Sequence, residues 1–371
     1  MKMRKIILLC CFNFAWLAFL AAQINVPFDT MHWDIRSQKH EFIEYKGQAA
    51  LMMKGGIALL KDAQFKNGTI EWDMAFPKER GFAGVRFRIK DLRNMEEFYF
   101  RPHQSGQADA NQYCPVTNGV SSWQLYHGPE YAVPYEYNFN KWFHVKLVVA
   151  DRRAELYIDN MRTPVLHIPY LKREPMEGGL MVYGSLVPAY FANFSYTPQD
   201  RPKLMNAPLT EKPMDPLTVA AWSVSNAFPD SQLKGVYHLA DMKDKDWKWK
   251  SLSAENSGTA NLAIVSDFDR VERNTVFAKL ILDSEKDQMK ALQIGFSDKA
   301  KVYCNGQILF GGNDSYRTRD FRYLGTIGYF DTVYLPLKKG RNEVFVAITE
   351  GFGGWGIKGK LENMKDIRII E

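Results

Sequence analysis

Apolar and polar residues alternate with a period of two along many short stretches of this chain. In FHVKLVV, at residues 143–149, every second residue from Phe143 to Val149 is apolar, and in VRFRIK an apolar residue alternates with a basic one. Side chains of a strand point alternately to its two faces, so such a pattern is typical of a strand with one buried face. The chain therefore reads as a series of half-buried strands.

Glycine, proline, asparagine and aspartate separate these stretches, as in β-sandwiches and barrels. The predicted strands lie at residues 68–76, 83–90, 97–101, 122–126, 142–150, 153–159, 190–196, 278–282, 291–296, 301–303, 307–310, 332–336, 343–349 and 367–370. No amphipathic helix of ordinary length is evident. We predict an all-β protein with two β-sandwich (jelly-roll) domains joined by a proline-rich linker.

The composition changes where five prolines interrupt a polar stretch without periodicity, between Pro198 and Pro216. Proline removes a backbone donor and disfavours helices and central strands, which favours a linker here. The predicted organisation is a domain at 24–198, a linker at 199–217 and a domain at 218–371.

The first residues predict a signal peptide at 1–22. A basic start containing Lys2 and Arg4 precedes a short apolar run, and Ala21 and Ala22 are small residues suited to cleavage. The alternative is an uncleaved anchor, although the run is short for a bilayer span of about 20 residues. We expect an exported protein that is periplasmic, on the cell surface or secreted, with no membrane span in its mature part.

The charge limits the kinds of partner, and the cysteine content limits how the fold can be stabilised. Removing the three basic residues of the signal from 48 leaves 45 against 42 acidic residues, a net charge of +3. This mild charge, without a basic tract, indicates no nucleic-acid partner. Of four cysteines, Cys10 and Cys11 leave with the signal, and two distant ones, Cys114 and Cys304, remain. Two cysteines cannot form a disulfide scaffold, so a large apolar core must stabilise the fold.

The N-terminal domain resembles the concanavalin A-like lectin/glucanase superfamily. The resemblance is carried by NGTIEWDMAF, GFAGVRFRI, KWFHVKLVVADRRAELYIDN and AYFANFSY. The same order of pieces is seen in laminin-G-like modules and in 3-keto-disaccharide hydrolase domains. The resemblance implies a jelly roll and a carbohydrate ligand.

The C-terminal domain resembles a galactose-binding-domain-like jelly roll, through SDKAKVYCNGQILF and VYLPLKKGRNEVFVAI. Its Asn305-Gly306 pair is a strong hairpin signal, because both residues accept a positive φ. Such modules accompany bacterial glycosidases, and a fold by itself does not establish an activity.

The laminarinase-type motif Glu-x-Asp-x-x-Glu is incomplete in this chain. Glu71 and Asp73 occupy its first two positions, and Phe76, which cannot transfer a proton, occupies the third. We therefore expect no ordinary β-glucan hydrolysis and interpret the two carboxylates as a solvated strand edge.

The richest group of polar residues lies between Arg86 and His127. Guanidinium, amide, carboxylate and aromatic groups together are typical of carbohydrate sites, and the alternative is a charged outer sheet face. The predicted ligand-binding residues are Arg86, Arg88, Tyr99, Arg101, His103, Gln107, Asp109, Gln112 and Trp123. Period-two spacing places Arg86 beside Arg88, and basic heads with few partners weakly favour an acidic sugar.

His103 with Glu97 or Asp109 is a weaker candidate for an acid–base pair. We predict no metal site and no cofactor, leaving open a structural calcium held by scattered oxygens. Aromatic residues on glycine-rich loops around Tyr316, Phe352 and Trp355 are either a second sugar platform or a cap on the sandwich.

We expect an exported carbohydrate-binding protein whose partner is an oligo- or polysaccharide. The alternatives are a glycoside-acting hydrolase or lyase of the 3-keto-disaccharide hydrolase type, which needs an intact acid–base pair, and a structural adhesin, which needs exposed apolar patches.

Overall fold

A computed structural model describes residues 22–243, 246–320 and 324–370 of the protein. The predicted signal peptide, with Cys10 and Cys11, lies outside the described residues except for Ala22. Cys114 and Cys304 are buried, and neither takes part in a disulfide.

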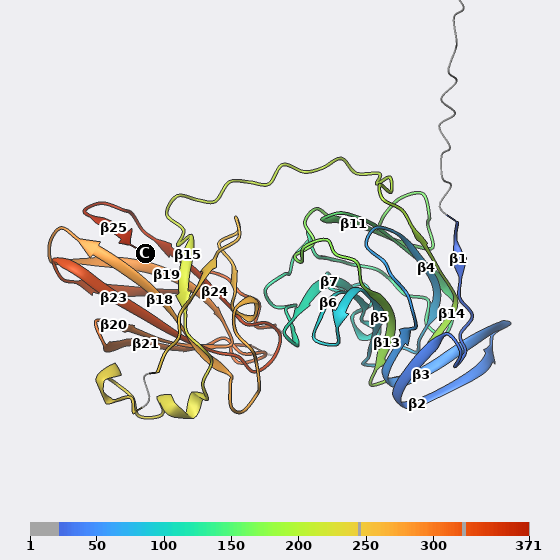
Figure 1. Ribbon diagram of the computed structural model, residues 1–371, viewed down its shortest axis with the longest axis horizontal. Coiled ribbons are helices and arrows are strands. Elements are labelled where there is room, and N and C mark those ends of the chain that lie inside the picture. Colours follow the sequence, from blue (N-terminus) through green and yellow to red (C-terminus); the bar gives the residue numbers. More distant parts are fainter. Residues whose placement is uncertain (1–21, 244–245, 321–323, 371) are drawn as a thin grey trace, which may run out of the picture.

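One curled antiparallel sheet forms the N-terminal module (residues 24–198) (Figure 1). Its strands are β1 (Ile24–Asn25), β2 (Trp33–Tyr45), β3 (Gln48–Leu60), β4 (Gly68–Ala75), β5 (Phe82–Asp91), β6 (Asn94–Phe100), β7 (Asn111–Thr117), β8 (Val120–Ser121), β9 (Ala132–Val133), β10 (Phe143–Ala150), β11 (Arg153–Ile158), β12 (Leu166–Ile168), β13 (Gly179–Ser185) and β14 (Ala189–Pro198). The main path runs β12-β11-β10-β4-β14-β3-β13-β5-β6-β7-β8. A 3₁₀ turn, η1 (Pro102–Gln104), leaves β6.

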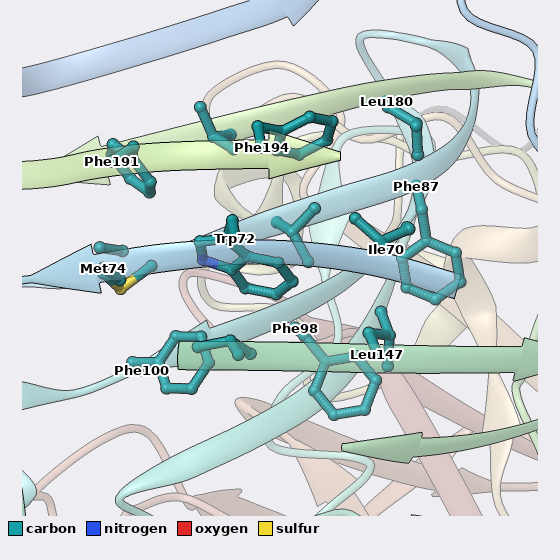
Figure 2. Close-up of a cluster of buried hydrophobic side chains, with 14 of the residues drawn as sticks. Ile70, Trp72, Met74, Phe87, Phe98, Phe100, Leu147, Leu180, Phe191 and Phe194 are labelled. Carbon is teal, nitrogen blue, oxygen red and sulfur yellow. The ribbon is translucent and has the colours of Figure 1, made fainter. Parts of the chain in front are cut away.

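The apolar faces of this curled sheet meet in a single core. Figure 2 shows Trp72 and Met74 of β4 among aromatic side chains that include Phe98 and Phe100 of β6. The Trp72 and Phe100 rings lie 6.3 Å apart, edge to face. The alternation predicted for residues 143–149 is confirmed, because its alternate apolar positions belong to this core.

Two smaller sheets form the described part of the C-terminal module (residues 218–370). One contains β16 (Lys250–Ser253), β15 (Ala221–Val224), β18 (Thr275–Ser284), β23 (Gly340–Thr349), β20 (Lys299–Cys304), β21 (Gln307–Asn313) and β25 (Ile367–Ile370); the other contains β17 (Ala260–Asn261), β24 (Gly356–Leu361), β19 (Gln288–Ser297) and β22 (Asp331–Leu337). The described part of this module also contains the 3₁₀ turns η2 (Asp230–Leu233), η3 (Leu239–Asp241) and η4 (Leu262–Ile264). The predicted turn is confirmed, with φ of 50° at Asn305 and 86° at Gly306.

The all-β prediction is therefore confirmed, with corrections to individual elements. Residues 122–126, predicted as a strand, form a turn, whereas β7 is a strand that was not among the predicted ones. The sequence analysis also missed the long β2–β3 hairpin. In the described parts of the chain, no helix is long and apolar enough to cross a bilayer.

A β-bulge overturns the prediction that Arg86 and Arg88 share a face. Met181 of β13 pairs with Arg86, but Gly179 pairs with Ile89, so β5 contains one extra residue at this point. Arg88 has a φ of 50°, is 1% exposed and donates to the carbonyl oxygens of Lys66 and Asp151 at 2.7 and 2.6 Å. Bulges break the period of two, so Arg88 supports the backbone instead of lying beside Arg86.

Residues 199–217 run between the modules in extended and turn conformations (Figure 1). They are held to the N-terminal module by Glu155, whose carboxylate accepts from the backbone N–H groups of Met205 and Asn206 at 2.9 and 2.7 Å. The modules also contact each other directly. Lys172 pairs with Glu255 of the C-terminal module at 2.6 Å.

Candidate functional site

A cleft of about 540 Å³ lies where the outer face of the N-terminal sheet meets loops of the C-terminal module. The sheet side comes from β3, β13, β5 and β6, with the turns that follow β6 and β8. The other side comes from Phe268, Arg270, Tyr316, Leu324 and residues 350–353. Both modules are therefore needed to enclose this space, which we call the cleft.

Six of the nine predicted ligand-binding residues line the cleft: Arg86, Tyr99, Arg101, His103, Asp109 and Trp123. Gln107 and Gln112 line an adjoining cavity of about 690 Å³, which Arg101, Asp109 and Trp123 also border. Arg88 does not line the cleft, because the bulge in β5 turns it toward the carbonyl oxygens of Lys66 and Asp151.

Arg86 and Arg101 of the cleft are both paired with carboxylates, which corrects the expectation of basic heads with few partners. Arg86 donates to Glu97 at 2.6 Å and lies over the Tyr183 ring, 4.2 Å from its centroid. The second oxygen of Glu97 accepts from the Tyr183 hydroxyl at 3.0 Å. The pair is largely buried, with 24% of the Arg86 side chain and 6% of the Glu97 side chain exposed.

Arg101 is held by a second network. It pairs with Asp109, and its other nitrogen donates to the Tyr99 hydroxyl at 2.7 Å and to Gln112 at 2.8 Å. The amide nitrogen of Gln112 donates to the carbonyl oxygens of Trp123 and Tyr126. Gln112 therefore has every polar group engaged inside the protein and acts as a support for Arg101.

His103 does not pair with Glu97 or Asp109 in the described structure, contrary to the prediction. Each carboxylate is bonded to an arginine instead. Burial, followed by the charges of Arg80 and Arg101, lowers the pKa of His103. Its buried Nδ1 has no hydrogen-bond partner among the described residues.

Three aromatic rings from both modules meet at the cleft. The ring centroids of Trp123 and Phe352 are 5.7 Å apart, those of Trp123 and Tyr316 6.3 Å, and those of Tyr316 and Phe352 6.1 Å. Phe352 is 52% exposed, and the Arg101 guanidinium lies 5.5 Å from the Trp123 ring centroid. The loops around Tyr316 and Phe352 therefore belong to the same site as Trp123, whereas Trp355 is fully buried in the core.

The glycine-rich loops of the C-terminal module contact the N-terminal module, which is neither the sugar platform nor the sandwich cap considered from the sequence. The side chain of Gln124 enters between two of them: it donates to the Leu324 carbonyl at 2.7 Å and accepts from the Ser297 hydroxyl at 3.2 Å. A Cβ at Gly353 or Gly325 would lie 2.1 or 2.2 Å from this side chain. These glycines therefore make room for the neighbouring module, not for a ligand.

Glu71 and Asp73 lie away from the cleft, on the opposite outer face of the module. They are on β4, a central strand between β10 and β14, so the interpretation as a strand edge is wrong. His144 lies between them, with Nδ1 2.7 Å from Asp73 and Nε2 3.2 Å from Glu71. These hydrogen bonds, first to Asp73 and then to Glu71, raise the pKa of His144 to about 9. Phe76 is 1% exposed, in the core.

Sequence reasoning missed Glu350, Arg270 and Arg80, which also line the cleft. Only Glu350 carried a signal, since it directly precedes the glycine-rich loop with Phe352. Within the described parts of the chain, no cluster of three or more His, Cys, Asp or Glu side chains could hold a metal ion.

No family model matches the chain, and no curated protein matches it. Among solved structures, the carbohydrate-binding module CBM66 from Bacillus subtilis is 19% identical, covering 45% of this chain and 95% of that one, with a TM-score of 0.35. A β-glucanase from Bacillus licheniformis is 12% identical, covering 48% and 99%, with a TM-score of 0.36. A lichenase from a mouse hindgut metagenome is 10% identical, covering 48% and 99%, with a TM-score of 0.36. At these values the likenesses assign neither a family nor an activity to this chain.

Proposed function

We propose that this protein is an exported carbohydrate-binding protein that holds an oligo- or polysaccharide in the cleft between its two modules. The observation that carries the proposal is the meeting of Trp123, Tyr316 and Phe352 beside the fixed Arg86 and Arg101 networks. Aromatic rings suit the C–H faces of a sugar, and fixed polar groups suit its hydroxyls. Export rests on the sequence of residues 1–22 alone.

The size and the charge of the cleft support this ligand class. Its volume of about 540 Å³ is within the range of small-molecule sites, roughly 300–1,000 Å³. Glu97 and Asp109 compensate Arg86 and Arg101, so these two arginines no longer argue for an acidic sugar. The other two arginines that line the cleft, Arg80 and Arg270, are exposed, so water screens their charges. A neutral glycan is therefore the ligand that we propose.

A glycan array probed with the parent protein and Trp123→Ala tests the proposal. Removing an aromatic residue from the centre of a binding site typically costs about 2 kcal/mol or more, or roughly thirtyfold in affinity. Trp142→Ala is the matched control, because Trp142 lies against Tyr45 outside the cleft. Glycan binding that survives Trp123→Ala unchanged would overturn the proposal.

Product analysis of every bound glycan separates binding from the hydrolase or lyase alternative. We expect the glycans to be recovered intact, because Glu97 and Asp109 are bonded to arginines and are poorly placed to exchange protons with His103.

A further inference from the structure

A buried carboxyl group lies at the side of the cleft formed by the C-terminal module. Glu350 directly follows β23, is 2% exposed, and lines both the cleft and a smaller cavity of about 390 Å³ next to it. One oxygen, Oε1, accepts from the backbone N–H of Gly354 at 3.2 Å. The other, Oε2, is buried and has no hydrogen-bond partner among the described residues. Glu350 is therefore a buried acid in the wall of the cleft, and its Oε2 has no partner among the described residues.

The surroundings of Glu350 disfavour its ionised form. Burial, followed by the charge of Asp298, raises its pKa well above the usual range, against smaller opposing effects of the Gly354 N–H and Arg270. Asp298 is itself occupied, since its Oδ2 accepts from the N–H groups of Gly351 and Phe352 at 2.8 and 2.9 Å. Burial raises the pKa of Asp298, against the smaller opposing effects of these N–H groups and of the charge of Lys299. Two carboxyls and exposed basic side chains thus surround the loop that carries Phe352.

A carboxyl in its neutral form has one O–H donor, whereas an ionised carboxylate can only accept. A buried polar atom without a partner costs about 1–3 kcal/mol, which a ligand group can recover by accepting the hydrogen bond. Hydroxyl and ether oxygens of a sugar are suitable acceptors. A carboxylate on the ligand is not a suitable acceptor, because Asp298 already provides a negative charge close to Glu350.

We propose that Glu350 is a ligand-contacting residue of the cleft, where its protonated carboxyl donates a hydrogen bond to an oxygen of a neutral glycan. This inference rests on the proposed function of the cleft and narrows the ligand to an uncharged sugar. It also makes the C-terminal module part of the binding site through a polar contact, in addition to the rings of Tyr316 and Phe352.

Two substitutions at the same position separate the hydrogen bond from the shape of the site. Glu350→Gln keeps a donor without an acid, and Glu350→Leu keeps similar bulk without a donor. The probes are the neutral hexaoses of cellulose, laminarin and xylan, and trigalacturonic acid as an anionic sugar. Glu285→Ala, exposed in the turn between β18 and β19, is the control.

We expect the parent to bind at least one neutral hexaose in preference to trigalacturonic acid. Glu350→Leu should weaken that binding about tenfold, while Glu350→Gln stays within about threefold of the parent, as for the loss of one hydrogen bond. An infrared difference spectrum between the parent and Glu350→Gln at pH 7 should contain the band of a protonated carboxyl. This spectrum needs no ligand and does not depend on whether Glu350→Leu folds.

The outcomes distinguish this inference from the function on which it rests. If Trp123→Ala abolishes binding but Glu350→Leu does not weaken it, the role of Glu350 is overturned and the binding function stands. An ionised Glu350 in the infrared spectrum overturns the inference in the same way. A parent protein that binds none of the array glycans overturns both.

Discussion

The two outer faces of the N-terminal module carry similar residues in different surroundings. On the cleft face, Arg101 is paired with Asp109 under the loops of the C-terminal module, with 7% and 22% of their side chains exposed. On the opposite face, His144 lies between Glu71 and Asp73 with 35% of its side chain exposed. The second module, and not the residue pattern, therefore makes a cleft of one charged sheet face.

The difference in burial determines how much each charge contributes to stability. Water screens exposed pairs, so they contribute about 0–1 kcal/mol, whereas removing one partner of a buried pair leaves an uncompensated charge and costs several kcal/mol. The following predictions test the comparison between the two faces.

The largest expected effect is that of Arg101→Ala on stability. Because the substitution leaves Asp109 without its guanidinium partner and removes donors to Tyr99 and Gln112, the free energy of unfolding should fall by about 3 kcal/mol. Denaturant unfolding measures this. The control is Arg36→Ala, which breaks an exposed pair with Asp34 on β2 and should cost less than about 1 kcal/mol. Equal losses in the two variants would break the comparison.

The second prediction concerns the contact that brings the C-terminal module over the cleft face. Gln124→Ala removes hydrogen bonds to Leu324 and Ser297 and leaves a void, so it should cost about 2 kcal/mol. Its unfolding curve should also separate into two transitions. Gln107→Ala, at an exposed position, should leave a single parental transition; the same curve for both variants would contradict the role of Gln124.

The third prediction is a pH effect on the opposite face. The pKa of folded His144, about 9, lies above the ordinary 6.5, so its contribution to stability is complete below pH 6.5 and is lost as the pH rises through about 9. Since its side chain is a third exposed, solvent screening reduces the effect to about 1 kcal/mol. Thermal unfolding between pH 6 and 10 measures it. His144→Gln should flatten the profile, and a slope that persists in this variant belongs to another group.

The smallest expected effect is a pH dependence of stability caused by His103 at the cleft. Its direction is opposite to that expected for His144. Burial, then Arg80 and Arg101, lowers the folded pKa of His103, with Asp109 opposing, so the contribution is present above pH 6.5 and is lost as the pH falls. Stability measured between pH 5 and 7 should therefore rise less steeply in His103→Gln than in the parent. An unchanged slope would show that His103 stays accessible to water.

Much of the fold could be predicted because strands impose a local rule. The alternation around Phe143 to Val149 and the Asn305-Gly306 turn both follow from neighbouring residues, and both are found in the structure. Tyr99 on β6 lines the cleft for the same reason, since it faces the same way as Glu97 two residues earlier. The other five reach the cleft from β5 and from the segments that follow β6 and β8: Arg86, Arg101, His103, Asp109 and Trp123.

Neighbouring residues were enough to predict the all-β class, the alternation of core and surface positions, and the candidate face. Three features follow instead from contacts between distant segments: a bulge turns Arg88 away, Glu97 and Asp109 compensate Arg86 and Arg101, and Phe352 meets Trp123. The two groups of features differ in the sequence distance over which the interactions act. Strand periodicity depends on adjacent residues, whereas a bulge depends on the pairing of β5 with β13, and ion pairs and ring contacts depend on which distant segments the packing of two modules brings together.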